Sequence, residues 1–198
     1  PRLYAGGEAG HPWLGAAVHE VEKGLEVIYT VPDSPAHRAG IREGDIIESL
    51  NGNNYTEIGD IQAALLDLDY PVLVSLRWDR EGESMEGAVS LAERPFSPIE
   101  ESLQKDLREN VFLPLFGMKI ERTDRFLWRN NYAVRRVLPG SIAYETGLSK
   151  DDPLSIQGWE VDTENRYAFL QIHVQKRKSG FLESIVQLAA YLETDIFI

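Results

Sequence analysis

The side chains that most often bind metals or attack substrates are few in this sequence. There is no cysteine, so a disulfide, a thiol nucleophile and a cysteine–zinc site are all excluded. None of the four histidines, His11, His19, His37 and His173, is paired with another at metal-ligand spacing. For the three that lie near the first expected strand and helix, His11, His19 and His37, we expect a surface or junction role. These patterns predict neither a metal site nor a cofactor.

Serine-hydrolase and phosphate chemistry also lack a visible site. Neither Gly-Asn-Ser-Gly-Gly nor Gly-x-Ser-x-Gly occurs, so a nucleophilic serine with its oxyanion hole has no place in the chain. Gly6-Gly7 is too short to indicate a phosphate-binding loop. The 32 acidic residues leave hydrolysis by a carboxylate pair open, because no pattern shows two of them facing each other. We therefore expect no catalytic residue and a binding or regulatory role.

Charge and composition narrow the classes of partner. The formal net charge is −12 at a sequence pI of about 4.8, which disfavours nucleic acids and anionic membranes as partners. We expect the basic run Lys176-Arg177-Lys178, followed by Ser179-Gly180, to be the solvated tip of a hairpin. No apolar run reaches the roughly 20 residues of a membrane span. The start at Pro1 suggests an excised fragment.

One sequence pattern occurs twice. Pro32-Asp33-Ser34-Pro35-Ala36 is matched by Pro139-Gly140-Ser141-Ile142-Ala143, with Ser34 and Ser141 lying 107 positions apart. The tetrapeptides Trp13-Leu14-Gly15-Ala16 and Leu115-Phe116-Gly117-Met118 precede the two copies. A repeat of this length is a duplicated domain and not a solenoid period.

Local signals predict the elements of the first copy. Ser34 can cap a short helix over 35–39 with Pro35 at its first position, and Gly40 can end it in the left-handed region. The strands we expect are 24–31, 46–50, 72–78 and 87–91, with the charged turn 79–86 between the last two. Asn51-Gly52 predicts a tight turn.

Two further helices follow from apolar spacing. Ile61, Leu65 and Leu68 recur at helical intervals and predict an amphipathic helix over 60–68, capped by Asp60. Ser97-Pro98 followed by Glu100 favours a second helix over roughly 98–109, in a linker at 96–110.

The order of these pieces over almost the whole first copy resembles the PDZ domains of HtrA-like, trypsin-fold bacterial serine proteases. The tail from Tyr167 to Ile198 is similar to the last segment of multi-PDZ proteases, those of spirochaetes included. The resemblance implies an α+β fold of two PDZ-like domains, each a small, partly open antiparallel β-barrel or sandwich with one or two short helices. Their expected bounds are 1–95 for the first domain, with its junction segment, and 111–198 for a degenerate second one.

The resemblance also implies a peptide site in the first domain. Backbone N–H groups at Leu14, Gly15 and Ala16 would hold a peptide carboxylate, and an open strand edge at Ala16, Ala17 and Val18 would pair with the peptide. The opposite wall would be formed by helix residues: Ile61, Ala64, Leu65 and Leu68. The small Ala16 and Ala17 predict a roomy pocket for a large apolar terminal side chain. The alternative is that the apolar residues are ordinary core and the groove stays empty.

The second copy departs from the pattern where the groove helix should follow. Tyr167 to Val174 is aromatic, β-branched and partly alternating, so it predicts a strand, although Ser184 to Tyr191 is compatible with a helix as well. Without that helix one wall of the groove is missing. We therefore expect the second domain to serve packing or regulation.

Two functions follow from the resemblance. The chain could be the peptide-binding and regulatory part of a periplasmic, secreted or cell-envelope protease, with peptide or unfolded-protein C-termini and its own upstream protease domain as partners. Alternatively, it could belong to a scaffold or interaction protein that lacks an active protease domain. The residues upstream of the chain would separate the two.

Overall fold

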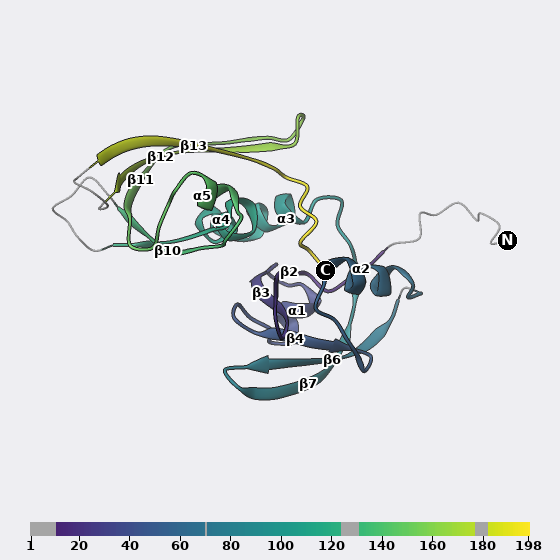
Figure 1. The fold of residues 1–198 in the computed structure, drawn as a ribbon. Helices are drawn as coiled ribbons and strands as arrows, with labels where there is room; N and C mark the ends of the chain where they lie inside the picture. Colours follow the sequence, from purple (N-terminus) through teal and green to yellow (C-terminus); the bar gives the residue numbers. More distant parts are fainter. Residues whose placement is uncertain (1–10, 70, 124–130, 177–181) are drawn as a thin grey trace. The chain divides into compact units, whose positions relative to one another are not determined.

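The computed structural model describes residues 11–69, 71–123, 131–176 and 182–198 (Figure 1). Most of the basic run Lys176-Arg177-Lys178 therefore lies outside the described residues. The chain divides into two compact units, one of Pro1–Pro98 with Ile196–Ile198 and one of Ile99–Asp195. The last three residues thus belong to the first unit, although almost a hundred residues of the second unit precede them.

An antiparallel sheet with the strand order β2-β3-β4-β6-β7 forms the first unit, and a short β5 pairs with β4. The strands are β2 (Ala16–Val21), β3 (Gly24–Thr30), β4 (Ile46–Leu50), β5 (Asn53–Asn54), β6 (Leu73–Arg80) and β7 (Glu83–Ser90). A separate two-stranded ribbon joins β1 (Pro12–Trp13) to β8 (Ala92–Glu93). The order places β2 at one end of the sheet.

The short helix α1 (Pro35–Arg38) forms for the reasons that its sequence indicates. The Ser34 side chain accepts a hydrogen bond from the His37 N–H at 3.2 Å, and Pro35 occupies the first turn. Gly40 follows with φ +76°, in the left-handed region. Ile41 then returns to the core with 2% of its surface exposed. The predictions for this segment are confirmed.

Two local predictions for the first unit were wrong. Helix α2 spans Ile58–Leu66 with Glu57 at its N-cap, so Asp60 lies in the first turn and does not cap the helix. The turn predicted over 79–86 is only Glu81-Gly82, because both residues have positive φ, of 55° and 88°. Such a two-residue turn matches the strand twist and lets β6 and β7 pair along their whole length.

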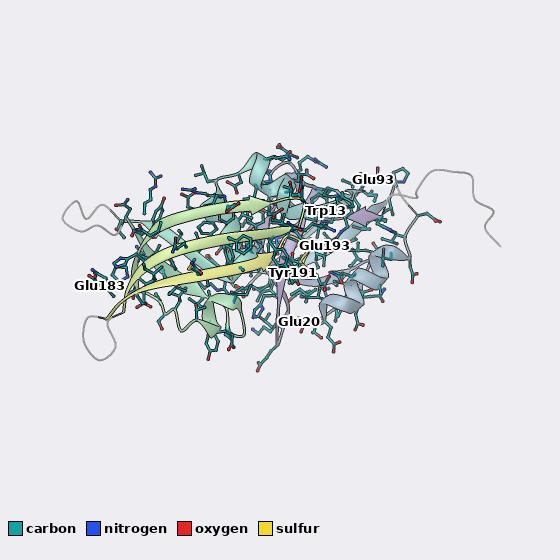
Figure 2. The ribbon with its side chains drawn as sticks, turned by 90° about the horizontal axis from the view of Figure 1, so that it is seen from above. Trp13, Glu20, Glu93, Glu183, Tyr191 and Glu193 are labelled. Atoms are coloured by element: carbon teal, nitrogen blue, oxygen red, sulfur yellow. The ribbon has the colours of Figure 1, made fainter. Side chains whose placement is uncertain are left out.

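The second unit is a five-stranded antiparallel sheet with the order β13-β12-β11-β10-β9. Its strands are β9 (Met118–Arg122), β10 (Tyr132–Val137), β11 (Pro153–Asp162), β12 (Tyr167–Lys176) and β13 (Leu182–Tyr191), and its short helix α5 spans Ile142–Glu145. Figure 2 shows β13 running from Glu183 to Tyr191 alongside β12. The strand interpretation of Tyr167 to Val174 is thereby confirmed, and the helical alternative for Ser184 to Tyr191 is wrong.

Two helices replace the single helix expected over 98–109. Helix α3 spans Pro98–Lys105 and α4 spans Arg108–Phe116, and Leu107 between them has extended backbone angles. Burial acts to raise the pKa of Glu109. The hydrogen bond from the Tyr132 hydroxyl, at 2.8 Å, together with the backbone N–H of Glu109 and the charge of Arg108, holds that pKa below its usual value. This contact fastens the start of α4 to β10.

Both units therefore combine short helices with antiparallel sheets, and the predicted α+β class is confirmed. Within the described ranges neither sheet closes into a barrel. In the same ranges no helix combines the length and the apolar character needed to cross a membrane.

Candidate peptide-binding groove

The sequence predicts an open outer edge for β2, and this prediction is wrong: the edge is occupied. Residues Ile196–Ile198 run antiparallel to it, with Phe197 opposite Ala17. The Val18 N–H donates to the Ile196 oxygen at 2.9 Å, and the Ile198 N–H donates to the Ala16 oxygen at 2.9 Å. Figure 1 shows the C-terminus beside β2 and α2. The edge therefore carries an added strand, which the chain itself supplies.

Three backbone N–H groups converge on one oxygen at the end of this added strand. The N–H groups of Leu14, Gly15 and Ala16 donate to the backbone oxygen of Ile198 at 3.2, 2.8 and 3.4 Å. A concave group of successive amides is a recurrent way to hold an anionic oxygen. The arrangement suits a terminal carboxylate, because such a group offers two oxygens and a negative charge to the amides.

The turn that carries these amides is fixed by its contacts with β3 and α1. The Gly15 oxygen accepts hydrogen bonds from the Val31 N–H at 3.0 Å and from the Ser34 hydroxyl at 3.2 Å. The Leu14 oxygen accepts from the Ala36 N–H at 2.8 Å. Gly15 has φ +85°, and a Cβ there would lie 2.2 Å from the Ser34 Cβ. Only glycine fits this position.

The side chain of Ile198 fills an apolar pocket. It is 1% exposed and belongs to the same buried cluster as Leu14, Ala16, Ile61 and Leu65. Complete burial of an isoleucine side chain contributes roughly 1.5–3 kcal/mol. A branched aliphatic side chain is thus buried between the start of β2 and the apolar side of α2.

The structure brings the predicted site residues together around this one segment. Leu14, Gly15 and Ala16 supply the amides, while Ala17 and Val18 lie along the paired strand. The others lie on the side of α2: Ile61 and Leu65 within the buried cluster, and Ala64 and Leu68 partly buried against it. Leu68 follows the end of α2.

Two polar residues of the groove were missed by the sequence analysis. Gln62 Nε2 and Arg94 Nη1 each donate to the Phe197 oxygen, at 3.1 and 3.0 Å. Gln62 is the neighbour of the predicted wall residue Ile61, so the helical stripe gave a partial signal. Arg94 follows β8, which reaches the groove by pairing with β1, and no local pattern reveals that pairing.

Glu20 connects the two walls of the groove. Its Oε1 accepts a hydrogen bond from the Ile58 N–H at 2.9 Å, so a side chain of β2 caps α2, for which Glu57 provides no side-chain cap. Figure 2 labels Glu20 on its strand. A carboxylate at a helix N-terminus also interacts favourably with the helix dipole.

We predict that Glu20→Ala frees the first turn of α2 at a cost of about 1 kcal/mol, the usual effect of losing an N-cap. Hydrogen exchange at the Ile61 amide should accelerate several-fold. Glu22→Ala removes a carboxylate from the exposed β2–β3 turn and is the matched control. Equal exchange rates in the two variants would contradict a capping role.

The second unit repeats the turn but not the amide site. Gly117 has φ +73°, and a Cβ added to it would lie 2.1 Å from the Ser141 Cβ. The same close approach exists between Gly15 and Ser34 in the first unit. However, the Gly117 N–H donates to the Leu113 oxygen at 2.9 Å at the end of α4, so it is already used. No helix comparable to α2 separates the strands here, because β11 leads through the turn 163–166 directly to β12, with which it pairs.

Comparisons with known proteins match each of the two units to PDZ domains. The profile of the TP0546 family PDZ domain matches residues 99–192, and a general PDZ-domain profile matches residues 26–77. A probable periplasmic serine endoprotease, DegP-like, of Marinomonas sp. (strain MWYL1) is 23% identical over 78% of this chain and 35% of its own length. The periplasmic pH-dependent serine endoprotease DegQ of Escherichia coli (strain K12) is 27% identical over 67% of this chain and 28% of its own length.

A solved structure of the HtrA3 PDZ domain bound to a phage-derived ligand (FGRWV) is also similar. It has 25% sequence identity and a TM-score of 0.36, and it covers 42% of this chain and 85% of its own. The present chain spans about a third of the length of the curated relatives it matches. Those relatives are named periplasmic, in agreement with the location that the sequence resemblance implied. The chain is a tandem PDZ region and belongs with those of HtrA-like serine proteases.

Proposed function

We propose that the first PDZ domain binds the carboxyl ends of peptides or unfolded proteins by adding them as a strand to β2. The observation that carries the proposal is the set of hydrogen bonds made by Ile196–Ile198, which follows both the strand edge and the amide turn. Backbone pairing supplies affinity that is independent of sequence, and the pocket at Ile198 supplies selectivity. The chain performs this task as a non-catalytic, regulatory part of a larger protein.

The pocket favours a large apolar terminal side chain. Ala16 and Ala17 are completely buried, and the small side chain of Ala16 lies in the same apolar cluster as Ile198, Ile61 and Leu65. A terminal alanine or glycine would leave part of this pocket empty and lose about 1–3 kcal/mol of burial. A charged terminal side chain would be excluded by desolvation.

Peptide titration tests this proposal. The chain is shortened after Asp195 to vacate the edge and is titrated with Glu-Thr-Asp-Ile-Phe-Ile while the amide resonances of Leu14 to Val18 are followed. We expect saturable shifts, and binding at least 10-fold weaker for the amidated peptide, because charge-assisted hydrogen bonds to the turn are lost. A peptide ending in Ala should also bind more weakly. Equal affinities for all three peptides would contradict both the recognition of the carboxylate and the selectivity of the pocket.

For the second domain we propose packing or regulation. In its equivalent turn the Gly117 amide is already hydrogen-bonded, and β11 is followed directly by β12 with no groove helix between them. The relatives suggest an upstream trypsin-like protease as the partner, with peptide binding shifting its activity. Finding the His, Asp and Ser of a catalytic triad upstream of this chain would support a protease. Substitution of any of these three residues would favour the scaffold alternative.

A further inference from the structure

We propose that residues Ile196–Ile198 are a built-in competitor of the first PDZ domain, so that an outside peptide gains the groove only by displacing them. The inference rests on the proposed function, since a competitor matters only where peptides bind. It concerns regulation of that site: the resting groove is closed by the chain's own segment.

The contacts of this segment are those of a complete ligand. Ile198 and Ile196 make the backbone bonds to β2, and three amides hold the Ile198 oxygen. The intervening oxygen, that of Phe197, is bound by Gln62 and Arg94. Every backbone oxygen of the three residues therefore has a partner in the groove.

Burial separates this segment from a loosely placed tail. Phe197 is 0% exposed and Ile198 is 1% exposed. Displacement exposes these two large apolar side chains to water, and an outside peptide offsets that cost only by burying apolar groups of its own in their place.

Displacement nevertheless requires no opening of either sheet. The Leu192 N–H is hydrogen-bonded to the Arg166 oxygen at 2.9 Å in the second unit, and only Glu193, Thr194 and Asp195 separate it from Ile196. Its backbone bonds to β2 and to the amide turn, and the side-chain bonds of Gln62 and Arg94, are those that a peptide in the groove would also make and lose. Among the described residues the strands β2, β3, β4, β6 and β7 pair with one another, so this sheet stays hydrogen-bonded when the edge is vacated.

The tether determines the strength of the competition. A ligand on a short linker acts at an effective concentration in the millimolar range. If its intrinsic dissociation constant is about 10–100 μM, the groove is empty in about 1–10% of molecules. An outside peptide of equal intrinsic affinity should then bind about 10- to 100-fold more weakly to the full chain than to a chain without the segment.

The test compares the 198-residue chain with the chain shortened after Asp195 and with Ile198→Ala. Without any peptide, we expect shortening to shift the amides of Leu14 to Val18 and to abolish exchange protection of the Val18 amide. With Glu-Thr-Asp-Ile-Phe-Ile, the shortened chain should bind at least 10-fold more tightly than the full chain, and Ile198→Ala should lie between them. Ile185→Ala removes the same side chain from a 64% exposed site and should bind like the full chain.

The outcomes separate this inference from the proposed function. Equal peptide affinity in the full and shortened chains leaves peptide binding intact and overturns the competitor. A second outcome is that shortening changes the amide shifts of Leu14 to Val18 while the shortened, folded chain binds no peptide. This result would support occupancy of the groove by the segment, but it would overturn the proposed peptide binding and with it the competitor role.

Two further results would also overturn the proposal. If the shortened chain and Ile198→Ala both fail to fold, residues 196–198 are a permanent strand of the first unit. If protection of Val18 falls on dilution while the chain passes from dimer to monomer, the segment occupies the groove of a second copy.

Discussion

Gly15→Ala should destabilise the first PDZ domain by about 2–5 kcal/mol, far more than an ordinary glycine-to-alanine change. The new Cβ would lie 2.2 Å from the Ser34 Cβ and 2.6 Å from its hydroxyl oxygen. Overpacking of this kind costs roughly 1–3 kcal/mol. The left-handed backbone at φ +85° adds about 1–2 kcal/mol for a residue with a Cβ.

Gly40→Ala is the matched control for this change. Gly40 has a similar φ of +76°, but nothing lies within 4 Å of its Cβ direction. It should therefore cost only the backbone term of about 1–2 kcal/mol. Hydrogen exchange at the buried Val27 amide of β3 measures the opening free energy of the first unit, and Ile172 of β12 serves as the reference in the second.

Equal effects of Gly15→Ala and Gly40→Ala on hydrogen exchange would contradict this prediction. If Gly15→Ala and Gly40→Ala slow or accelerate exchange equally, the close approach to Ser34 contributes nothing and the turn can relax around a side chain. If the prediction holds, Gly15→Ala should also weaken binding of peptide carboxylates, since relaxing the clash moves the Leu14 and Ala16 amides away from their common target.

The success of sequence reasoning in the first unit follows from local signals. The cap at Ser34, the proline after it and the left-handed Gly40 all act within one turn of chain, and each was predicted from its own neighbourhood. The strand β4 was placed at the same residues because apolar and β-branched side chains end there at Asn51-Gly52. Ser141, at the matching position of the repeat, caps α5 in the same way.

The failures concern partners that are distant in the sequence. The start of α2 depends on Glu20, which lies 38 residues away, and no cap is visible in its own sequence. The added strand depends on pairing Ala17 with Phe197. The apolar ending Ile196-Phe197-Ile198 after a polar Asp195 was a possible signal, but nothing local tells that it lies against β2.

The second unit shows why a matching turn does not make a matching site. Ser141 and Gly117 repeat the close contact of Ser34 and Gly15. In the first unit the residues before the glycine form a strand and a turn, which leaves amides free for a ligand. In the second they form α4, whose own carbonyl at Leu113 takes the Gly117 N–H. The helix thus occupies, by hydrogen bonding within the chain, the donor that a peptide would need.

Phe116→Ala should destabilise the second unit by about 3–5 kcal/mol, the cost typical of deleting a buried phenylalanine. Phe116 is 0% exposed, and its ring lies 5.8 Å from that of Phe112 and 6.3 Å from that of Trp159, both near edge-to-face. The substitution therefore leaves a cavity where α4 meets β11 and removes two favourable aromatic contacts.

Leu107→Ala, just before α4 at a 70% exposed side chain, is the control and should change stability by no more than about 0.5 kcal/mol. Exchange of the Leu170 and Ile172 amides in β12 measures both variants, because a single unfolding midpoint is poorly defined for a chain of two domains. A loss below 1 kcal/mol for Phe116→Ala would mean that α4 is not part of the core. The helix could then leave the Gly117 turn at little cost, and the second domain would regain the amide donor that its fold now withholds.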